Sequence, residues 1–271
     1  MNARIFSSCY VGLVLMFMVL PWAYGEPLSK ATPPPSSHAV GRTALDNYVH
    51  TPDPAYKWTL VNTIEGDGYK AFILDMKSQT WRSPDEVDRT LWQHWLTIVK
   101  PDKVISKTGL MLIGHRNNEN HVPDFVDSIA TEVALGTGAV VAYVGQVPNQ
   151  PLTFAGETEG RTEDDQIAYA WDQYLKTGDP LWASRFPMVK ATVRAMDTTQ
   201  NFLASDTGGG NVVEDFVVGG ASKRGWTTWL TGAVDERVVA IIPIVIDALN
   251  VSQLMRHHFA SYGGWSPALA P

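Results

Sequence analysis

The stretch EDFVVGGASKRGWTTWL, residues 214–230, decides the fold. A Val-rich run ends in two glycines, a serine follows at position 222, and a Trp-containing run with helical spacing begins directly after it. An apolar strand that turns at once into an amphipathic helix is the repeating unit of α/β proteins. The stretch therefore predicts a strand-to-helix corner with Ser222 at its tip.

Apolar strands and helical stripes alternate along the rest of the chain. Short apolar runs, typical of strands buried on both faces, occupy 108–115, 139–145 and 238–247. Helical spacing covers 123–138, 161–180 and about 186–204. This alternation predicts an α/β fold with a doubly wound, mostly parallel sheet of the α/β-hydrolase type.

An antiparallel hairpin is expected before that sheet. Two alternating runs within 56–82 flank Gly66-Asp67-Gly68, a turn sequence of hairpins. The segment 83–101 has a mixed pattern that fits either a short helix or a third strand.

The first 25 residues have the pattern of a secretory signal peptide. Arg4 precedes the apolar run YVGLVLMFMVLPWAYG, and small residues before Glu26 suit cleavage there. Pro21 and the shortness of the run argue against a membrane anchor. We expect signal peptide 1–25, flexible linker 26–42, domain 43–271, no membrane span after cleavage, and a periplasmic or secreted location.

Composition excludes several classes of function. The net charge of −7 does not favour nucleic acid or anionic lipid. The single cysteine, Cys9, lies in the predicted signal, so the mature domain is expected to have neither disulfides nor a Cys nucleophile. The loop 115–121, HRNNENH, matches no metal-binding spacing, and no metal or cofactor is predicted.

Ser222 is the candidate nucleophile. In α/β hydrolases a serine on a strained strand-to-helix turn lifts its hydroxyl above the sheet. Gly220 and Gly225 leave room for strand and helix to approach, giving G-x-S-x-x-G in place of the usual G-x-S-x-G. The alternative is a serine that caps the helix. The glycines at 208–210 precede a strand, which argues against a dinucleotide site.

An oxyanion hole is expected beside the serine. One donor would be the backbone N–H of Lys223, and the other would come from the loop Gly114–Asn117 after a core strand. His115, Arg116 and Asn117 are candidates for substrate contact, with His115 and Arg116 suited to acidic groups; a solvated loop is the alternative. Gln146 and Arg224 are also predicted to contact a small-molecule, peptide or glycan substrate.

The acid and the base are harder to assign. Asp247 ends an apolar strand, where a carboxylate faces the active-site edge, and is the candidate acid. His257 and His258 lie in a segment with helical spacing, where a base is less expected. The chain stops without a closing strand or capped helix, so we expect a truncated C-terminus whose missing part holds two or more strands, the acid and the His.

The chain resembles the PhoPQ-activated pathogenicity-related protein family. The matching stretches include VVAYVGQVPNQPLTF, FVVGGASKRGWTTWLTGAVDERVVAIIPIVID and YGGWSPAL, in one colinear order over about 45–271. The resemblance implies an exported α/β-hydrolase-like protein whose family members continue beyond this chain with an Asp and a His. Residues 220–225 are also similar to the serine corner of glucuronoyl esterases.

Two functions are compatible with the sequence. One is a serine hydrolase acting on an ester or amide, with Ser222 as nucleophile. The other is a catalytically inactive protein that uses the same cleft to bind a partner in envelope defence or virulence.

Overall fold

The computed structural model describes residues 41–118, 121–247 and 250–265. The predicted signal peptide and nearly all of the predicted linker lie outside the described residues. The helices are α1 (Ala44–His50), α2 (Ser128–Thr137), α3 (Glu163–Thr177), α4 (Arg185–Ala204), α5 (Lys223–Val234) and α6 (Val251–Tyr262), with a short 3₁₀ turn at Pro180–Trp182.

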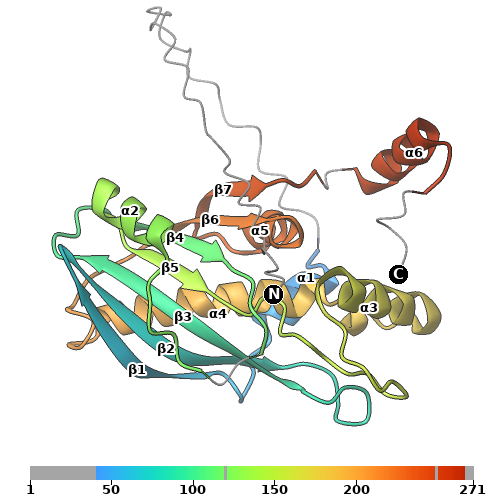
Figure 1. The fold of residues 1–271 in the computed structure, drawn as a ribbon, viewed down its shortest axis with the longest axis horizontal. Coiled ribbons are helices and arrows are strands. Elements are labelled where there is room, and N and C mark those ends of the chain that lie inside the picture. Colours follow the sequence, from blue (N-terminus) through green and yellow to red (C-terminus); the bar gives the residue numbers. More distant parts are fainter. Residues whose placement is uncertain (1–40, 119–120, 248–249, 266–271) are drawn as a thin grey trace, which may run out of the picture. The chain divides into compact units, whose positions relative to one another are not determined.

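Seven strands of the described chain form one sheet, shown in Figure 1. They are β1 (Lys57–Gly66), β2 (Tyr69–Thr80), β3 (Leu91–Pro101), β4 (Thr108–Ile113), β5 (Val141–Val144), β6 (Asp215–Ala221) and β7 (Val238–Ile244). Their order across the sheet is β1-β2-β3-β5-β4-β6-β7. The chain thus exchanges the places of β4 and β5 before it continues outward to β6 and β7.

The sheet is mixed, and the prediction of a mostly parallel sheet is wrong in this respect. Strand β1 pairs with β2, β2 with β3, and β3 with β5, all antiparallel. Only the pairs β4–β5, β4–β6 and β6–β7 are parallel. The difference arises from the ambiguous segment 83–101, which forms the long strand β3 and carries the antiparallel pairing into the middle of the sheet.

Helices cover both faces of the sheet, as the doubly wound prediction requires. On one face the small residues Ala130 and Ala134 of α2 pack against Ala71, Val99 and Val141 of the strands. On the other face a larger core joins α4 to the sheet through residues such as Met188, Phe202 and Met111. The α/β class is therefore confirmed, with α2 on one side and α4 on the other.

All four parallel strands end at the same edge of the sheet. The register aligns Ile113 of β4 with Val144 of β5 and with Gly220 of β6, and aligns Gly220 with Pro243 of β7. Ligands of open α/β sheets bind at this carboxyl edge, near the point where the strand order reverses. No helix within the described ranges is long and apolar enough to cross a membrane.

Candidate functional site

A strained backbone residue follows each of the four parallel strands. Ser222 and Val245 come directly after β6 and β7, Gln146 comes two residues after β5, and Arg116 comes three residues after β4. The φ angles of Arg116, Gln146, Ser222 and Val245 are 149°, 57°, 55° and 48°. Positive φ is unfavourable for residues other than glycine, and such strain persists where the surrounding structure enforces it, most often at functional sites. The carboxyl edge is therefore the candidate site.

Ser222 occupies a tight corner between β6 and α5. Its φ of 55° and ψ of −122° lie outside the helical and extended regions, and its side chain makes no capping hydrogen bond to α5. Its N–H donates to the carbonyl of Ile244 at 2.8 Å, which ties the corner to β7. The half-buried hydroxyl is thus not used as a helix cap, and the geometry is that of a nucleophile elbow.

Two glycines make this corner possible. A Cβ on Gly220 would lie 2.8 Å from the carbonyl oxygen of Arg224, and one on Gly225 would lie 2.5 Å from Cγ2 of Ile246 and 3.0 Å from the oxygen of Gly220. These contacts explain the spacing G-x-S-x-x-G: in this chain the residue that needs to lack a side chain is Gly225, and Arg224 is free to carry one.

The two basic side chains after the serine point into the protein and share one carboxylate. Lys223 Nζ lies 2.6 Å from Oε2 of Glu163 and 3.2 Å from Oδ1 of Asp164. Arg224 Nη2 lies 2.7 Å from Oε1 of Glu163, and Nε donates to the carbonyl of Val147 at 2.6 Å. Lys223 and Arg224 are 7% and 8% exposed, so neither is a free surface cation available to substrate.

Glu163 is a residue of the candidate site that the sequence did not single out. It begins α3 at a φ of 52°, and Gln150 holds it through a 2.8 Å bond in each direction. Burial by itself raises the pKa of Glu163, but bonds from Arg224, Lys223 and Gln150 outweigh it and bring the pKa to about 2. An acidic residue in the first turn of a helix is ordinarily explained by the helix dipole. The sequence feature that points to a further partner for Glu163 is the pair of basic residues after Ser222.

A third cation lies beneath the elbow. Arg185, 8% exposed, donates from Nη1 to the carbonyl of Lys223 at 2.8 Å and stacks 4.5 Å from the ring centroid of Trp226. Burial lowers the pKa of Arg185 to about 10. Lys223, Arg224 and Arg185 face Glu163 and Asp164, so the start of α5 carries a local excess of positive charge.

The loop after β4 lies at the same edge of the sheet as Ser222, because β4 pairs with β6 and aligns Ile113 with Gly220. A Cβ on Gly114 would lie 2.0 Å from the hydroxyl oxygen of Tyr143, so glycine is required there. His115 is exposed, and Asn117 accepts a 3.1 Å bond from Gln150. Arg116 lies 4.8 Å above the ring of Phe125 and makes no ion pair within the described residues.

The polar groups of Gln146 bond to other parts of the protein. It is 2% exposed, its Oε1 accepts from the N–H of Trp95 at 2.7 Å, and its backbone carbonyl accepts from Asn149 at 2.9 Å. The side-chain oxygen therefore supports β3. Arg224 is occupied in the same way by Glu163 and Val147. The structure thus brings both residues to the correct edge of the sheet, but points their polar groups at the protein.

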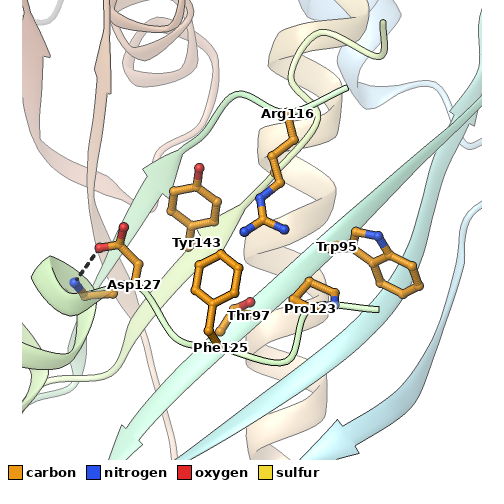
Figure 2. Close-up of a pocket in the computed structure, with 9 residues that line it drawn as sticks. Trp95, Thr97, Arg116, Pro123, Phe125, Asp127 and Tyr143 are labelled. Atoms are coloured by element: carbon orange, nitrogen blue, oxygen red, sulfur yellow. Dashed lines mark hydrogen bonds between the residues drawn. The ribbon is translucent and has the colours of Figure 1, made fainter. Parts of the chain in front are cut away.

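A small cavity of about 40 Å³ opens beside this loop, as Figure 2 shows. Its walls come from β3, β5, the loops after β4 and β5, and the segment before α2; the lining residues are Trp95, Thr97, Arg116, Pro123, Phe125, Asp127, Ala130, Tyr143 and Gly145. In the close-up the guanidinium of Arg116 points into it, whereas the hydroxyl of Tyr143 points away from it, toward the backbone of Gly114.

The acid and base candidates are not assembled around Ser222. Asp247 lies exposed past the end of β7, at the predicted edge. His257 approaches Ser261 at 3.5 Å, and His258 stacks on Trp265 with a centroid separation of 6.0 Å. Within the described chain, no imidazole hydrogen-bonds to Ser222. The described residues also contain no group of three or more His, Cys, Asp or Glu side chains that could hold a metal ion.

Comparison with known proteins gives the family. Residues 45–271 match the family described as PhoPQ-activated pathogenicity-related protein, and the chain belongs to that family. A relative, autocrine proliferation repressor protein A from Dictyostelium discoideum, is 46% identical over 233 residues. The match covers 85% of this chain and 46% of the relative, so the chain spans about half of the relative's length.

Solved structures with a partly similar arrangement are esterases. An acetyl xylan esterase from Paenibacillus sp. R4 aligns with a TM-score of 0.46 and 13% identity, over 81% of this chain and 65% of that one. A glucuronoyl esterase from Solibacter usitatus aligns with a TM-score of 0.44 and 17% identity, over 71% and 52%.

Proposed function

We propose that this member of the PhoPQ-activated pathogenicity-related family is an exported serine hydrolase of the α/β-hydrolase type that cleaves an ester or amide. The observation that carries the proposal is the corner at Ser222, where a non-glycine residue with a φ of 55° presents an uncapped hydroxyl at the carboxyl edge of a parallel sheet segment. Nothing in the packing of α5 needs a serine there, since its hydroxyl does not cap the helix.

The chemistry begins with attack of Ser222 Oγ on the substrate carbonyl. The hydroxyl proton passes to an imidazole, which we place outside the described residues because neither His257 nor His258 bonds to Ser222. That imidazole then gives the proton to the leaving alcohol or amine, and water releases the acyl group by the reverse sequence. Asp247, beyond the end of β7, is the proposed acid that orients the imidazole.

The backbone N–H of Lys223 and a donor from the Gly114–Asn117 loop are the proposed oxyanion hole. Donors of this kind act strongly because they are fixed before the reaction begins. Three observations support Lys223 as such a donor: it starts α5, its carbonyl is held by Arg185, and its side chain is held by Glu163. The positive charge gathered at this helix start adds to the stabilisation of an oxyanion.

A fluorophosphonate probe tests the proposal, because it reacts with activated serines. We expect labelling of the wild-type protein at Ser222, identified by peptide mass spectrometry, and complete loss of labelling in Ser222→Ala. Ser252→Ala, which removes an exposed serine of α6, is the matched control and should label like the wild type. Absence of labelling in a folded wild-type protein would reject an activated nucleophile.

A second function is favoured by one observation. No described imidazole reaches Ser222, so a protein of this kind could keep the fold and the cleft while lacking turnover. On this alternative the protein binds a peptide, a glycan or an envelope component in defence or virulence. The Dictyostelium relative is named for repression of proliferation, and not for a reaction. The binding protein and the hydrolase differ in one readout, since only the hydrolase is labelled by the probe.

Export is part of the proposal. The pattern of residues 1–25 supports a cleaved signal, and a periplasmic or secreted location follows from it. Fractionation of the producing cells, with the N-terminus of the mature protein sequenced, should give a first residue of Glu26. A protein that stays in the cytoplasm with Met1 intact would overturn this location.

A further inference from the structure

We infer that the cavity beside Arg116 is a specificity pocket that binds a carboxylate of the substrate. The inference deepens the proposed function, because it names the class of ester or amide: one whose acyl or leaving group carries a free carboxylate away from the bond that is cleaved. The inference rests on the proposed function only in that it calls the bound molecule a substrate, since binding at the cavity can be measured without any reaction.

Arg116 is the first element of this pocket. Its guanidinium lies 4.8 Å from the centroid of Phe125, while no described carboxylate pairs with it. Stacking on an aromatic face holds a guanidinium in one plane and leaves its N–H groups at the edge available, the arrangement that binds a carboxylate through two parallel hydrogen bonds. The backbone of Arg116 is strained, with a φ of 149°, which indicates that the loop is held in this conformation.

Tyr143 forms the second wall of this pocket. Its ring lines the same cavity as Arg116, while its hydroxyl lies against the backbone of Gly114. The hydroxyl donates to none of the described residues. Burial raises the pKa of Tyr143, against the opposing effect of Arg116, so the phenol stays protonated and can donate. A carboxylate bound at Arg116 would therefore lie beside a neutral phenol and not beside a second negative charge.

Other walls restrict what can enter. Trp95, Pro123 and Phe125 give the cavity apolar sides, and about 40 Å³ has room for a group of a few atoms. Asp127 also lines it, but its Oδ1 accepts from the N–H of Ala130 at 3.1 Å and caps α2. That bond and the positive end of the helix reduce the repulsion that this carboxylate would exert on an anion.

The cavity lies near enough to Ser222 for one substrate molecule to reach both. Gly145 of the cavity follows β5, Ser222 follows β6, and β4 lies between them in register. Neighbouring strands are ~4.8 Å apart, so two strand spacings put the cavity ~10 Å from the nucleophile. A substrate with its reacting carbonyl at Ser222 can therefore place a carboxylate several bonds away at Arg116.

The test uses two probes in the Ser222→Ala protein, in which hydrolysis cannot occur by the proposed route. Monomethyl succinate carries one carboxylate, and dimethyl succinate is its neutral counterpart. Calorimetric titration should show saturable binding of the monoester and none of the diester. Adding Arg116→Ala should weaken binding of the monoester at least about tenfold, as expected for loss of a charge-assisted bond.

The matched control is Lys103→Ala, which removes an exposed positive charge at the opposite edge of the sheet. It should leave the affinity for monomethyl succinate unchanged. Equal binding of the neutral diester, unchanged affinity in Arg116→Ala, or no saturable binding of the monoester would each overturn the pocket. Because these measurements involve no labelling at Ser222, their failure is distinct from failure of the proposed reaction.

Discussion

Ser222 and Asp247 follow neighbouring parallel strands at one edge of the sheet, but their surroundings differ. Around Ser222 the chain is closely packed: Gly220 touches the backbone of α5, and Lys223 and Arg224 are buried against Glu163. In β7 and beyond it the described chain packs loosely. Val239 is 57% exposed, Ile244 is 46% exposed, and α6 has no buried residue.

The difference shows which half of the proposed catalytic site the described residues build on their own. A nucleophile needs a strained corner and fixed donors, and local packing between β6, α5 and α3 is enough to provide them. An acid and a base need side chains from separate segments to meet above the sheet. The predictions below test that division, starting with the largest expected effect.

The first prediction concerns Asp247, the candidate acid on the loosely packed side. If Asp247 orients the base, Asp247→Asn should reduce the rate of fluorophosphonate labelling by about 10³-fold or more, because a misoriented imidazole cannot accept the serine proton. Glu236→Gln removes an exposed carboxylate at the other end of the same strand and should leave the rate unchanged. Equal rates in the two variants would remove Asp247 from the catalytic residues.

The second prediction concerns the packed side. Gly220→Ala places a Cβ 2.8 Å from a backbone oxygen, so strand and helix must separate. We expect the free energy of unfolding to fall by about 3 kcal/mol in urea denaturation, and labelling of Ser222 to fall with it. Gly136→Ala is the control, because its Cβ would meet nothing within 4 Å and alanine favours the helix α2. Equal stability of the two variants would contradict the close contact at the elbow.

The third prediction concerns the carboxylate that holds the elbow. Glu163→Gln leaves Lys223 and Arg224 buried without their shared partner. We expect a loss of about 2 kcal/mol in unfolding free energy, below the value for a fully buried pair because Glu163 is partly exposed. Asp165→Asn, at an exposed carboxylate of the same helix, should cost less than about 0.5 kcal/mol.

An equal and small effect of Glu163→Gln and Asp165→Asn would show that the elbow does not depend on this carboxylate. A lower labelling rate in Glu163→Gln, measured at a temperature where the variant is folded, would in turn link the ion pairs to the activity of Ser222.

The fourth prediction is the dependence of stability on pH. Burial lowers the pKa of His94 to about 4 from an ordinary 6.5, so the unfolded chain binds this proton first and stability falls as pH drops from 6.5 to 4. The pKa of Glu163 is about 2 against an ordinary 4.5, so its contribution is present above pH 4.5 and is lost toward pH 2.

Urea unfolding across this range should show both losses in the wild type. Glu163→Gln should keep the loss between pH 6.5 and 4 and show a smaller loss below 4.5, where carboxylates such as Asp179 and Asp235, whose pKa values are also lowered, still contribute. A variant with the same profile as the wild type in the lower range would show that Glu163 has no depressed pKa.

Much of the fold could be predicted because local patterns carry it. The apolar runs at 108–115, 139–145 and 238–247 contain β4, β5 and β7, and the corner at 214–230 contains β6 and the first eight residues of α5. The antiparallel pairing of β3 could not be predicted, since the same residues are compatible with a helix or a strand. In addition, the sequence of a strand does not determine which strand it pairs with. The family resemblance was confirmed over 45–271.

The candidate site, like the fold, could be predicted from the sequence only in part. The sequence alone determined the corner at Ser222, because a strand, small residues and a helix in direct succession leave one backbone path, and that path is local. Only the tertiary structure decided that Glu163 holds Lys223 and Arg224, and that Tyr143 needs Gly114 to be a glycine. These contacts join residues far apart in the chain, and a charge or a hydroxyl specifies the kind of partner it needs without specifying which one the fold will bring to it.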